Sequence, residues 1–365
     1  MGFKCGIVGL PNVGKSTLFN ALTKSGIEAQ NYPFCTIEPN VGIVYVPDPR
    51  LDAITKIAKP QKTIPTTMEF VDIAGLVEGA SKGEGLGNKF LSHIRETDAI
   101  AHVVRCFDDG DITHVHGKTN PLHDLGIIET ELLCADMETL SKAIFRAEKL
   151  AKSGDAEKRK EKELFNRLSD HMNEGNIAKT FIDNEDKEQQ DILKLLCLLT
   201  AKPMMYVANV DEPDAINTEY LNALIEHANK QNIQVVSLCA SLESELSELD
   251  TDEQAEMLQE LNLEESGLAK VIRAGYELLG LETYFTAGEK EVRAWTYTSG
   301  STAPQAAGKI HTDFEKGFIR AEIISYADFT ENSGEQGAKQ AGKWRLEGKE
   351  YVVCDGDVIH FRFNV

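Results

Sequence analysis

The stretch G-L-P-N-V-G-K-S-T, residues 9–17, decides how this chain folds. It follows an apolar run at residues 3–8 and precedes an amphipathic segment at 17–23, which is the strand, glycine loop and helix context that the G-x-x-x-x-G-K-[ST] pattern requires. The backbone N–H groups of such a loop and the positive end of the helix attract phosphate. Lys15 can reach the outer phosphates, and the Ser16 hydroxyl can hold Mg²⁺. The stretch predicts a nucleoside triphosphate site, with a chance match in a glycine-rich loop as the alternative.

The composition is that of a globular protein with more than one domain. The chain has 365 residues, of which 42% are apolar and 27% charged, and this length predicts two or three domains. No apolar run approaches the roughly 20 residues of a membrane span, and the N-terminus lacks the form of a signal peptide. The seven cysteines are scattered without a C-x-x-C pair, so we expect a reducing, cytoplasmic location. The net charge of −21 argues against attraction of the whole molecule to nucleic acid, so any RNA contact needs a local basic patch.

Two further motifs follow in the order expected of a phosphate-dependent switch. Thr36 lies in a proline-containing loop, about twenty residues after Ser16, where switch proteins place the Thr that closes over Mg²⁺ and the γ-phosphate. A strand at residues 66–71 then ends in Asp72-Ile73-Ala74-Gly75. A carboxylate at the end of an apolar strand needs a partner, and hydrated Mg²⁺ is a suitable one. We therefore expect Ser16, Thr36 and Asp72 to hold the metal, and the Gly75 N–H to approach the γ-phosphate.

The group that positions the attacking water is not evident. The residue after Gly75 is Leu76, whereas many switch GTPases have a Gln there that orients the water. Hydrolysis is then either slow or assisted by another group. His114, in the loop after a strand at residues 99–107, is a candidate for that role. The alternative is that His114 is an ordinary surface residue of a solvent loop.

A helical region interrupts the nucleotide-binding pattern between residues 122 and 199. Apolar residues at heptad spacing predict a long helix that ends near residue 151, and a second charged helix is expected at about 156–172; the spaced positions are Leu133, Met137, Leu140, Ile144, Ala147 and Ala151. We expect an antiparallel hairpin with a basic tip that contains Lys149, Lys152, Lys158, Arg159, Lys160 and Lys162. Such a run is either a solvated helix face or a contact for RNA.

The residues that follow the next strand, at 203–208, bear on base specificity. GTP-specific proteins carry Asn-Lys-x-Asp at this place, and their Asp accepts two hydrogen bonds from guanine. This chain has Asn209-Val210-Asp211-Glu212 instead, in which Glu212 is too long for that position and Val210 lacks the Lys stem that covers the base. The site is therefore not built to discriminate for guanine. After a strand at 234–238, the backbone of Cys239, Ala240 and Ser241 is expected to border the base, and the acidic stretch 243–265 to be a solvated helical surface.

The last part of the chain has strand-like spacing at residues 291–298, 318–324, 349–354 and 358–363. This pattern predicts a small β-rich module used for binding, and we find no catalytic constellation in it. We expect a nucleotide-binding domain at 1–121 and 200–280, a helical insertion at 122–199 and the β-rich domain at 281–365.

Taken together, these motifs closely resemble the YchF/Obg-like ATPases, in the Obg branch of the translation-factor class of P-loop proteins. The resemblance covers essentially the whole chain and includes a segment like a TGS domain that begins near Tyr284 and runs through Trp295. It implies a cytosolic ATPase that tolerates GTP and binds ribosomes. It also implies phosphate binding by residues 12–17 and contact of Asn209 and Val210 with the base. Asn12 stands where some relatives bind potassium, so K⁺ is a second candidate cofactor besides Mg²⁺.

The sequence thus predicts an α/β protein: a P-loop NTPase domain with a doubly wound, mostly parallel sheet, an inserted antiparallel helical hairpin and a C-terminal β-rich, TGS-like domain. We expect a slow, Mg²⁺-dependent ATPase that acts as a switch on the ribosome. The expected catalytic residues are Lys15, Gly75 and His114. The expected nucleotide-binding residues are Asn12, Val13, Gly14, Lys15, Ser16, Thr17, Asn209, Val210, Glu212, Cys239, Ala240 and Ser241. The alternatives are a GTP-specific switch and a nucleotide-gated scaffold whose hydrolysis is incidental.

Overall fold

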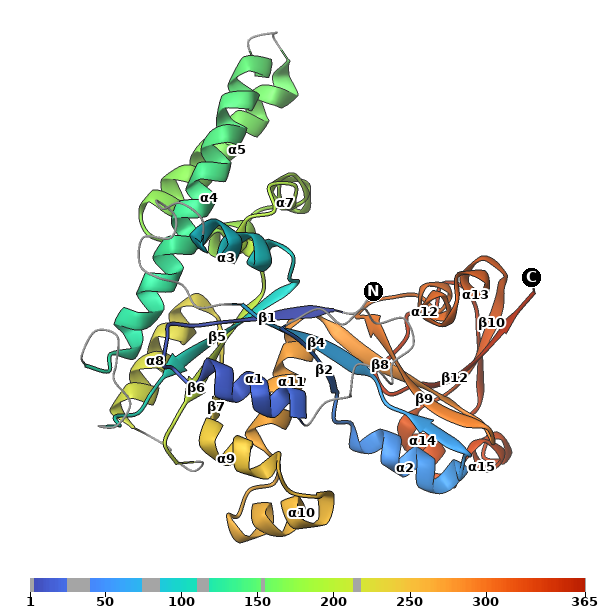
Figure 1. Ribbon diagram of the computed structural model, residues 1–365. Coiled ribbons are helices and arrows are strands. Elements are labelled where there is room, and N and C mark those ends of the chain that lie inside the picture. Colours follow the sequence, from blue (N-terminus) through green and yellow to red (C-terminus); the bar gives the residue numbers. More distant parts are fainter. Residues whose placement is uncertain are drawn as a thin grey trace. The chain divides into compact units, whose positions relative to one another are not determined.

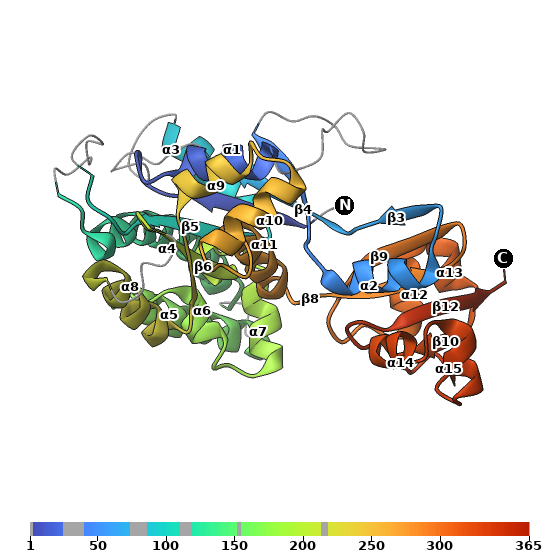
Figure 2. The same cartoon turned by 90° about the horizontal axis from the view of Figure 1, so that it is seen from below.

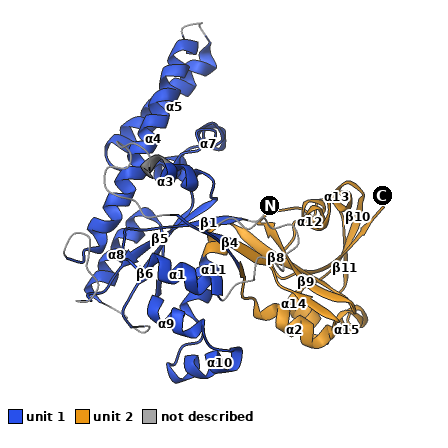
Figure 3. Ribbon diagram, in the orientation of Figure 1, with its two compact units in different colours: residues 1–43, 69–274 blue, residues 44–68, 275–365 orange. Residues whose placement is uncertain are grey.

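The computed structural model describes residues 3–24, 40–73, 86–109, 118–151, 155–212 and 218–364, with the side chains of 86–88 left out. The chain divides into two compact units (Figure 3). Unit 1 contains residues 1–43 and 69–274, and unit 2 contains residues 44–68 and 275–365. No helix in the described ranges is both long and apolar enough to cross a membrane.

The first sheet lies mostly in unit 1, and its six strands have the order β2-β4-β1-β5-β6-β7. The strands are β1 (Lys4–Val8), β2 (Val41–Tyr45), β4 (Thr67–Asp72), β5 (Ala99–Arg105), β6 (Met204–Asn209) and β7 (Gln234–Leu238). β4, β1, β5, β6 and β7 pair in parallel, which confirms the expected mostly parallel sheet. β5 and β6 are buried along their whole length, as is usual for central parallel strands covered on both faces.

The strand order places a ligand site at the carboxyl edge of this sheet. After β1 the chain builds β2 and β4 on one side and then returns to place β5 on the other side of β1. In open α/β sheets, ligands bind outside the carboxyl ends of the strands where the order reverses in this way. The P-loop leaves β1 at that point and leads into α1 (Lys15–Lys24), whose Leu18, Ala21 and Leu22 are buried.

The remaining helices of unit 1 cover the sheet or extend from it (Figure 1). They are α3 (Leu86–Arg95), α4 (Pro121–Ala151), α5 (Ala156–Asn173), α6 (Ala178–Ile182), α7 (Lys187–Lys194), α8 (Glu219–Gln231), α9 (Ala240–Leu246), α10 (Thr251–Glu260) and α11 (Gly267–Leu278), with a 3₁₀ turn, η2, at Leu199–Ala201. α11 begins in unit 1 and ends in unit 2.

The predicted helical hairpin is confirmed. α4 and α5 lie side by side and extend away from the sheet (Figure 1), and the first helix ends at Ala151, where the heptad pattern stops. Leu140 and Ala147 of α4 are buried against Leu164 and Leu168 of α5. α5 begins with Asp155 as its N-cap, whose side chain accepts hydrogen bonds from the Glu157 and Lys158 backbone N–H groups. Local sequence patterns were sufficient to predict both helices, because each helix is stabilised by packing its apolar stripe against that of the other.

One part of the acidic stretch is not solvated surface, contrary to the expectation. Glu243 in α9 is only 2% exposed, and its two carboxylate oxygens accept hydrogen bonds from the backbone N–H groups of Gly267 and Leu268 at 2.7 and 3.1 Å. These groups open α11, so the carboxylate caps that helix from another segment of the chain. Leu246 of α9 is also buried, whereas α10, which has no buried residue, agrees with the prediction.

Unit 2 also contains a six-stranded sheet, in the order β11-β10-β12-β8-β9-β3 (Figure 2). Its strands are β3 (Lys62–Ile64), β8 (Leu281–Ala287), β9 (Glu291–Thr298), β10 (Phe318–Ile324), β11 (Arg345–Glu347) and β12 (Val358–Phe363). Its helices are α2 (Pro49–Ala58), α12 (Ala303–Ile310), α13 (Thr312–Lys316), α14 (Tyr326–Glu331) and α15 (Glu335–Gln340). The β8–β9, β10–β11 and β10–β12 pairs are antiparallel, whereas β12–β8 and β3–β9 are parallel.

The C-terminal β-rich domain is confirmed, but one of the four expected strands is not formed. Residues 349–354 form no strand; they contribute only a bridge between Val352 and Thr302. The Cys354 backbone N–H instead donates to the Asp357 carboxylate at 3.0 Å, so side-chain hydrogen bonding turns the chain there before β12.

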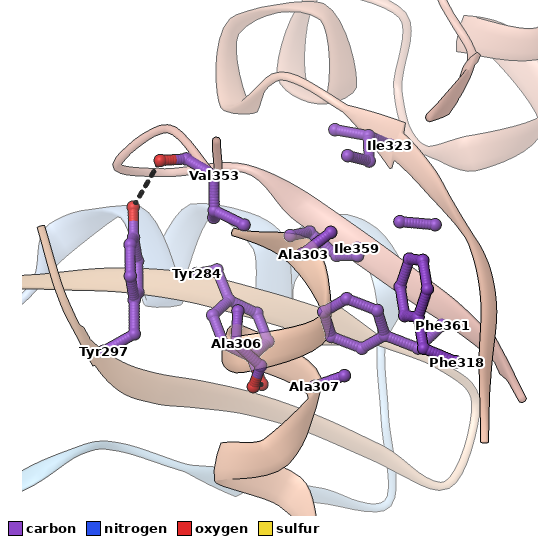
Figure 4. Packing of buried hydrophobic residues seen from close by; sticks show 11 residues of the cluster. Tyr284, Tyr297, Ala303, Ala306, Ala307, Phe318, Ile323, Val353, Ile359 and Phe361 are labelled. Atoms are coloured by element: carbon purple, nitrogen blue, oxygen red, sulfur yellow. Dashed lines mark hydrogen bonds between the residues drawn. The ribbon is translucent and has the colours of Figure 1, made fainter. Parts of the chain in front are cut away.

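Aromatic side chains form much of the core of unit 2. Tyr284, Tyr297, Phe318 and Phe361 pack with the alanines of α12 (Figure 4). The Tyr284 hydroxyl donates to the Ala306 carbonyl at 3.0 Å, and that of Tyr297 lies 3.2 Å from the Val353 carbonyl. The phenols therefore fill the core while their polar ends remain hydrogen-bonded.

Residues 44–68 belong to unit 2, whereas the sequence-based division assigned them to the nucleotide-binding domain. α2 buries Leu51 and Ile54 against Phe285 and Val292, and β3 extends the sheet beside β9. The local sequence does not reveal that residues 44–68 join unit 2, because the apolar face of α2 packs on strands that lie more than 200 residues later in the chain. The expected boundaries of the helical insertion and of the last domain stay a prediction.

Candidate nucleotide site

The P-loop joins β1 to α1 through backbone conformations that favour its residue types. Asn12 has φ +64° and Gly14 has φ +93°, in the left-handed region where glycine, and among the other residues Asn, is found most readily. A Cβ at Gly14 would lie 2.2 Å from Asn209 Nδ2, and one at Gly9 would lie 2.8 Å from the Val103 carbonyl oxygen. The two glycines of the motif are therefore required by close approach to β5 and to the end of β6.

Asn209, the last residue of β6, connects two other segments at the carboxyl edge. Its side chain is 4% exposed; Nδ2 donates to the Val13 carbonyl and Oδ1 accepts from the Ala240 N–H, both at 3.0 Å. One buried amide thus fixes the P-loop relative to the loop after β7. The sequence predicts that Asn209 contacts the base; that contact stays a prediction.

Lys15 and Asp72 form an ion pair at the same edge. Lys15, the first residue of α1, is 8% exposed, and its Nζ contacts Asp72 Oδ1 at the end of β4. The next two residues, Ser16 and Thr17, are exposed in the first helical turn. The structure therefore brings the Lys15 ammonium, with Ser16 next to it in the chain, to the Asp72 carboxylate, because α1 follows β1 and Asp72 ends β4, which pairs with β1 in parallel.

These oxygen donors suit Mg²⁺. A hard cation that keeps several waters and takes phosphate oxygens from its substrate needs only one or two protein ligands. Ser16 and Asp72 supply a hydroxyl and a carboxylate, and the described residues contain no cluster of three His, Cys, Asp or Glu that would hold a metal without the nucleotide. Thr36, the third expected ligand, lies outside the described residues.

A pocket of about 470 Å³ lies along this edge, which is a suitable size for a nucleotide. It is lined by Asn12, Gly14, Thr17, Phe107, Asp108, Asp109, Asn209, Val210, Asp211, Ala240 and Ser241. Seven of these are predicted nucleotide-binding residues. Val13, Lys15 and Ser16 belong to the same loop and helix but are not among the lining residues.

Glu212 and Cys239 do not line the pocket. Glu212 is exposed, and its backbone N–H donates to Asp211 Oδ1 at 3.1 Å. Cys239 is 4% exposed, and its thiol lies 3.3 Å from the Asp211 carbonyl. Their expected contacts with the nucleotide stay a prediction, as do those of Gly75 and His114, which with Leu76 lie outside the described residues.

The segment Phe107 to Asp109 lines the pocket but was not among the predicted site residues. It follows β5, and the buried Arg105 shapes it: Nε donates to the Phe107 carbonyl at 3.1 Å and a terminal nitrogen to the Asp109 carbonyl at 3.3 Å. The guanidinium also lies 4.6 Å from the centre of the Phe107 ring. The position of this segment in the chain could have indicated its place in the site, because every loop that follows a parallel strand reaches the same edge of the sheet.

Acidic and thiol groups near the pocket differ in protonation. Hydrogen bonds with Thr119 and Tyr220 hold the pKa of Asp108 below its usual value, so it is an ionised acceptor at neutral pH. Burial raises the pKa of the Cys106 thiol to about 12, which keeps it protonated and excludes it as a nucleophile.

Known proteins share this arrangement. A family model described as a 50S ribosome-binding GTPase matches residues 4–135, and the model for the C-terminal domain of YchF GTPases, described as a protein of unknown function, matches residues 281–364. The chain is 61% identical to the ribosome-binding ATPase YchF of Haemophilus influenzae and 56% identical to that of Bacillus subtilis, with all of each chain covered. The structure of the Schizosaccharomyces pombe YchF GTPase is 40% identical, has a TM-score of 0.89 and covers 99% of this chain and 98% of its own.

The parallel sheet, the P-loop and the pocket at its carboxyl edge define the chain as a P-loop nucleoside triphosphatase, a class of enzyme that hydrolyses nucleoside triphosphates. Because the similarity to the curated relatives extends over the full length, the chain belongs to the YchF family. The predicted family and fold class are both confirmed.

Proposed function

We propose that this protein is a ribosome-binding ATPase that hydrolyses Mg²⁺·ATP, tolerates GTP and acts as a nucleotide-dependent switch in translation. The observation that carries the proposal is the pocket at the carboxyl edge, which is continuous with a P-loop beside the Lys15–Asp72 pair. The names of the full-length relatives support both the ATPase activity and the ribosome as partner. A ribosomal partner in turn supports a cytoplasmic location.

The residues of the site fit transfer of the γ-phosphoryl group to water. Water attacks the γ-phosphorus, the bond to the β–γ bridging oxygen breaks, and ADP leaves with the negative charge on its β-phosphate. Lys15 and the loop N–H groups would stabilise charge on the phosphate oxygens. Bound Mg²⁺, held by Ser16, Asp72 and Thr36, would supply further charge neutralisation. Asn209 keeps the loop in place for this step.

Hydrolysis is proposed to be slow without a stimulating partner. Leu76 provides no polar group to orient water, and His114 is the proposed alternative. The Gly75 N–H is proposed to bind the γ-phosphate and to change position when that phosphate is lost. We also propose K⁺ near Asn12 as a second cation, which predicts faster turnover in potassium than in sodium salts.

The preference for ATP is tested by calorimetric titration with Mg²⁺·ATP and Mg²⁺·GTP. We expect ATP to bind at least as tightly as GTP, because neither Val210 nor Glu212 provides the guanine-specific contacts. Combined Val210→Lys and Glu212→Asp substitution should shift the preference toward GTP. A wild-type preference for GTP of about 100-fold, roughly 2.7 kcal/mol, would overturn the proposal in favour of a GTP-specific switch.

RNA is a proposed further contact, through the tip of the helical hairpin. Two of the tip charges are paired within the protein: Lys158 with Glu161 at 2.5 Å and Lys162 with Glu148 at 3.3 Å. Arg159 and Lys160 are exposed on α5, and on α4 the exposed Phe145 ring lies below Lys149. The observation that favours RNA is this combination of cations with an exposed aromatic ring, which suits phosphates and unpaired bases.

A further inference from the structure

The loop after β5 occupies the middle of the nucleotide pocket. In the sheet, β5 lies between β1, which leads into the phosphate-binding loop, and β6, which leads to the base side. Phe107, Asp108 and Asp109 line the pocket from this central position. A nucleotide that lies along the edge from the P-loop to Val210 and Ala240 therefore passes its ribose by these residues.

Asp108 has the chemistry of a ribose ligand and not that of a phosphate ligand. A carboxylate repels phosphate, whereas the ribose hydroxyls are hydrogen-bond donors that it can accept. The hydroxyls of Thr119 and Tyr220 hold its pKa low, so the carboxylate stays ionised. An ionised carboxylate has about four acceptor positions, so these two hydroxyls do not exhaust it.

Tyr220 fixes Asp108 from a different element. Its hydroxyl, in the first turn of α8, donates to Asp108 Oδ2 at 2.9 Å across 112 residues of sequence. α8 in turn packs against β6, β7 and α4 of the same unit. The carboxylate on the exposed loop is thus held in one orientation by a helix anchored to the sheet.

We propose that Asp108 accepts a hydrogen bond from a ribose hydroxyl of the bound nucleotide, and that Tyr220 is a positioning residue that holds the Asp108 carboxylate for this contact. The inference rests on the proposed function and adds a sugar-recognition contact to it. Neither residue was among the expected site residues, because neither belongs to a nucleotide-binding motif.

The test is calorimetric titration of the full chain with four Mg²⁺ complexes: ATP, 2′-deoxy-ATP, 3′-deoxy-ATP and purine riboside triphosphate, which lacks the amino group of adenine. Wild type should bind ATP about tenfold more tightly than at least one deoxy analogue, the effect of one hydrogen bond to a charged group. Asp108→Ala should weaken ATP binding about tenfold, leave that analogue unchanged and so abolish the discrimination. Tyr220→Phe should reduce the discrimination about threefold, and Tyr45→Phe, at an exposed tyrosine that ends β2, is the matched control.

Several results would overturn the inference. Equal binding of the four triphosphates by wild type, or an equal loss for all of them in Asp108→Ala, would assign Asp108 a structural role only. If Asp108→Ala weakened the binding of ATP and of both deoxy analogues but not that of purine riboside triphosphate, the contact of Asp108 would be with the base. If Asp108→Ala does not fold, the Tyr220→Phe variant, which removes one oxygen, provides the test through its ratio of affinities for ATP and the deoxy analogue. Failure of wild type to bind Mg²⁺·ATP at all would instead refute the proposed function.

Discussion

The two sheets of this protein have six strands each, but they differ in strand direction and in where polar side chains gather among the described residues. In unit 1, five neighbouring strands run parallel, and the segments that follow them bring Lys15, Asp72 and Asn209 to one edge. In unit 2, most pairs are antiparallel, so successive strands end at opposite edges. Its buried phenols are hydrogen-bonded within the same unit, Tyr284 to the Ala306 carbonyl at 3.0 Å and Tyr297 to the Glu282 carboxylate at 2.6 Å. Strand direction, more than strand number, therefore separates a site from a packed core.

The largest expected effect concerns the packing of unit 2. Phe285→Ala should destabilise this unit by about 4 kcal/mol, because the ring is fully buried against α2 and its loss leaves a cavity. Both tryptophans, Trp295 and Trp344, belong to unit 2, so denaturation followed by tryptophan fluorescence measures this unit alone. ATP affinity should stay within about twofold of wild type at low denaturant. A large loss of affinity in a still-folded variant would contradict the separation of roles.

The complementary change is Lys15→Ala in unit 1. It should lower ATP turnover about 100-fold, roughly 2.7 kcal/mol, since the main cation for the phosphates is removed. The tryptophan transition of unit 2 should not move. Lys24→Ala, at the exposed last turn of the same helix, is the matched control and should retain turnover. Ribosome co-sedimentation of the Lys15 variant adds a second readout: binding that persists without turnover would favour the scaffold alternative.

The smallest of the three effects is a pH dependence confined to unit 1. His102 in β5 is 1% exposed, and burial lowers its pKa from 6.5 to about 3. Below pH 6.5 the unfolded chain therefore binds a proton that the folded unit does not, so stability falls as the pH falls from 6.5 toward 3. By pH 5 the loss should be about 2 kcal/mol, from 1.4 kcal/mol per pH unit.

His102→Phe should remove this part of the acid sensitivity, measured by urea denaturation followed by the circular dichroism of the helices at pH 7 and pH 5. The tryptophan transition of unit 2 is the internal control, because the described buried residues of that unit include no histidine. Equal pH slopes in wild type and variant would show that His102 does not titrate on unfolding.

The correct predictions share a physical basis in local pattern. The P-loop, the hairpin helices and the parallel strands each depend on residues a few positions apart, so glycine spacing and apolar periodicity were sufficient. The features that were predicted wrongly depend on contacts with residues far away in the sequence. Glu243 has the polarity of a surface residue, and only the start of α11, 24 residues later, makes it a buried cap.

The sequence by itself determined the class of site, because a phosphate-binding loop needs particular residues in consecutive positions. It also determined the family, since relatives match along the whole chain. Only the tertiary structure decided that α2 joins unit 2, that Asn209 holds the P-loop, and that Asp108 lies in the pocket. These contacts join segments far apart in sequence: Val13 and Asn209 are 196 residues apart, and Asp108 and Tyr220 are 112 residues apart. Their geometry is set by the packing of the strands between them, which no local pattern records.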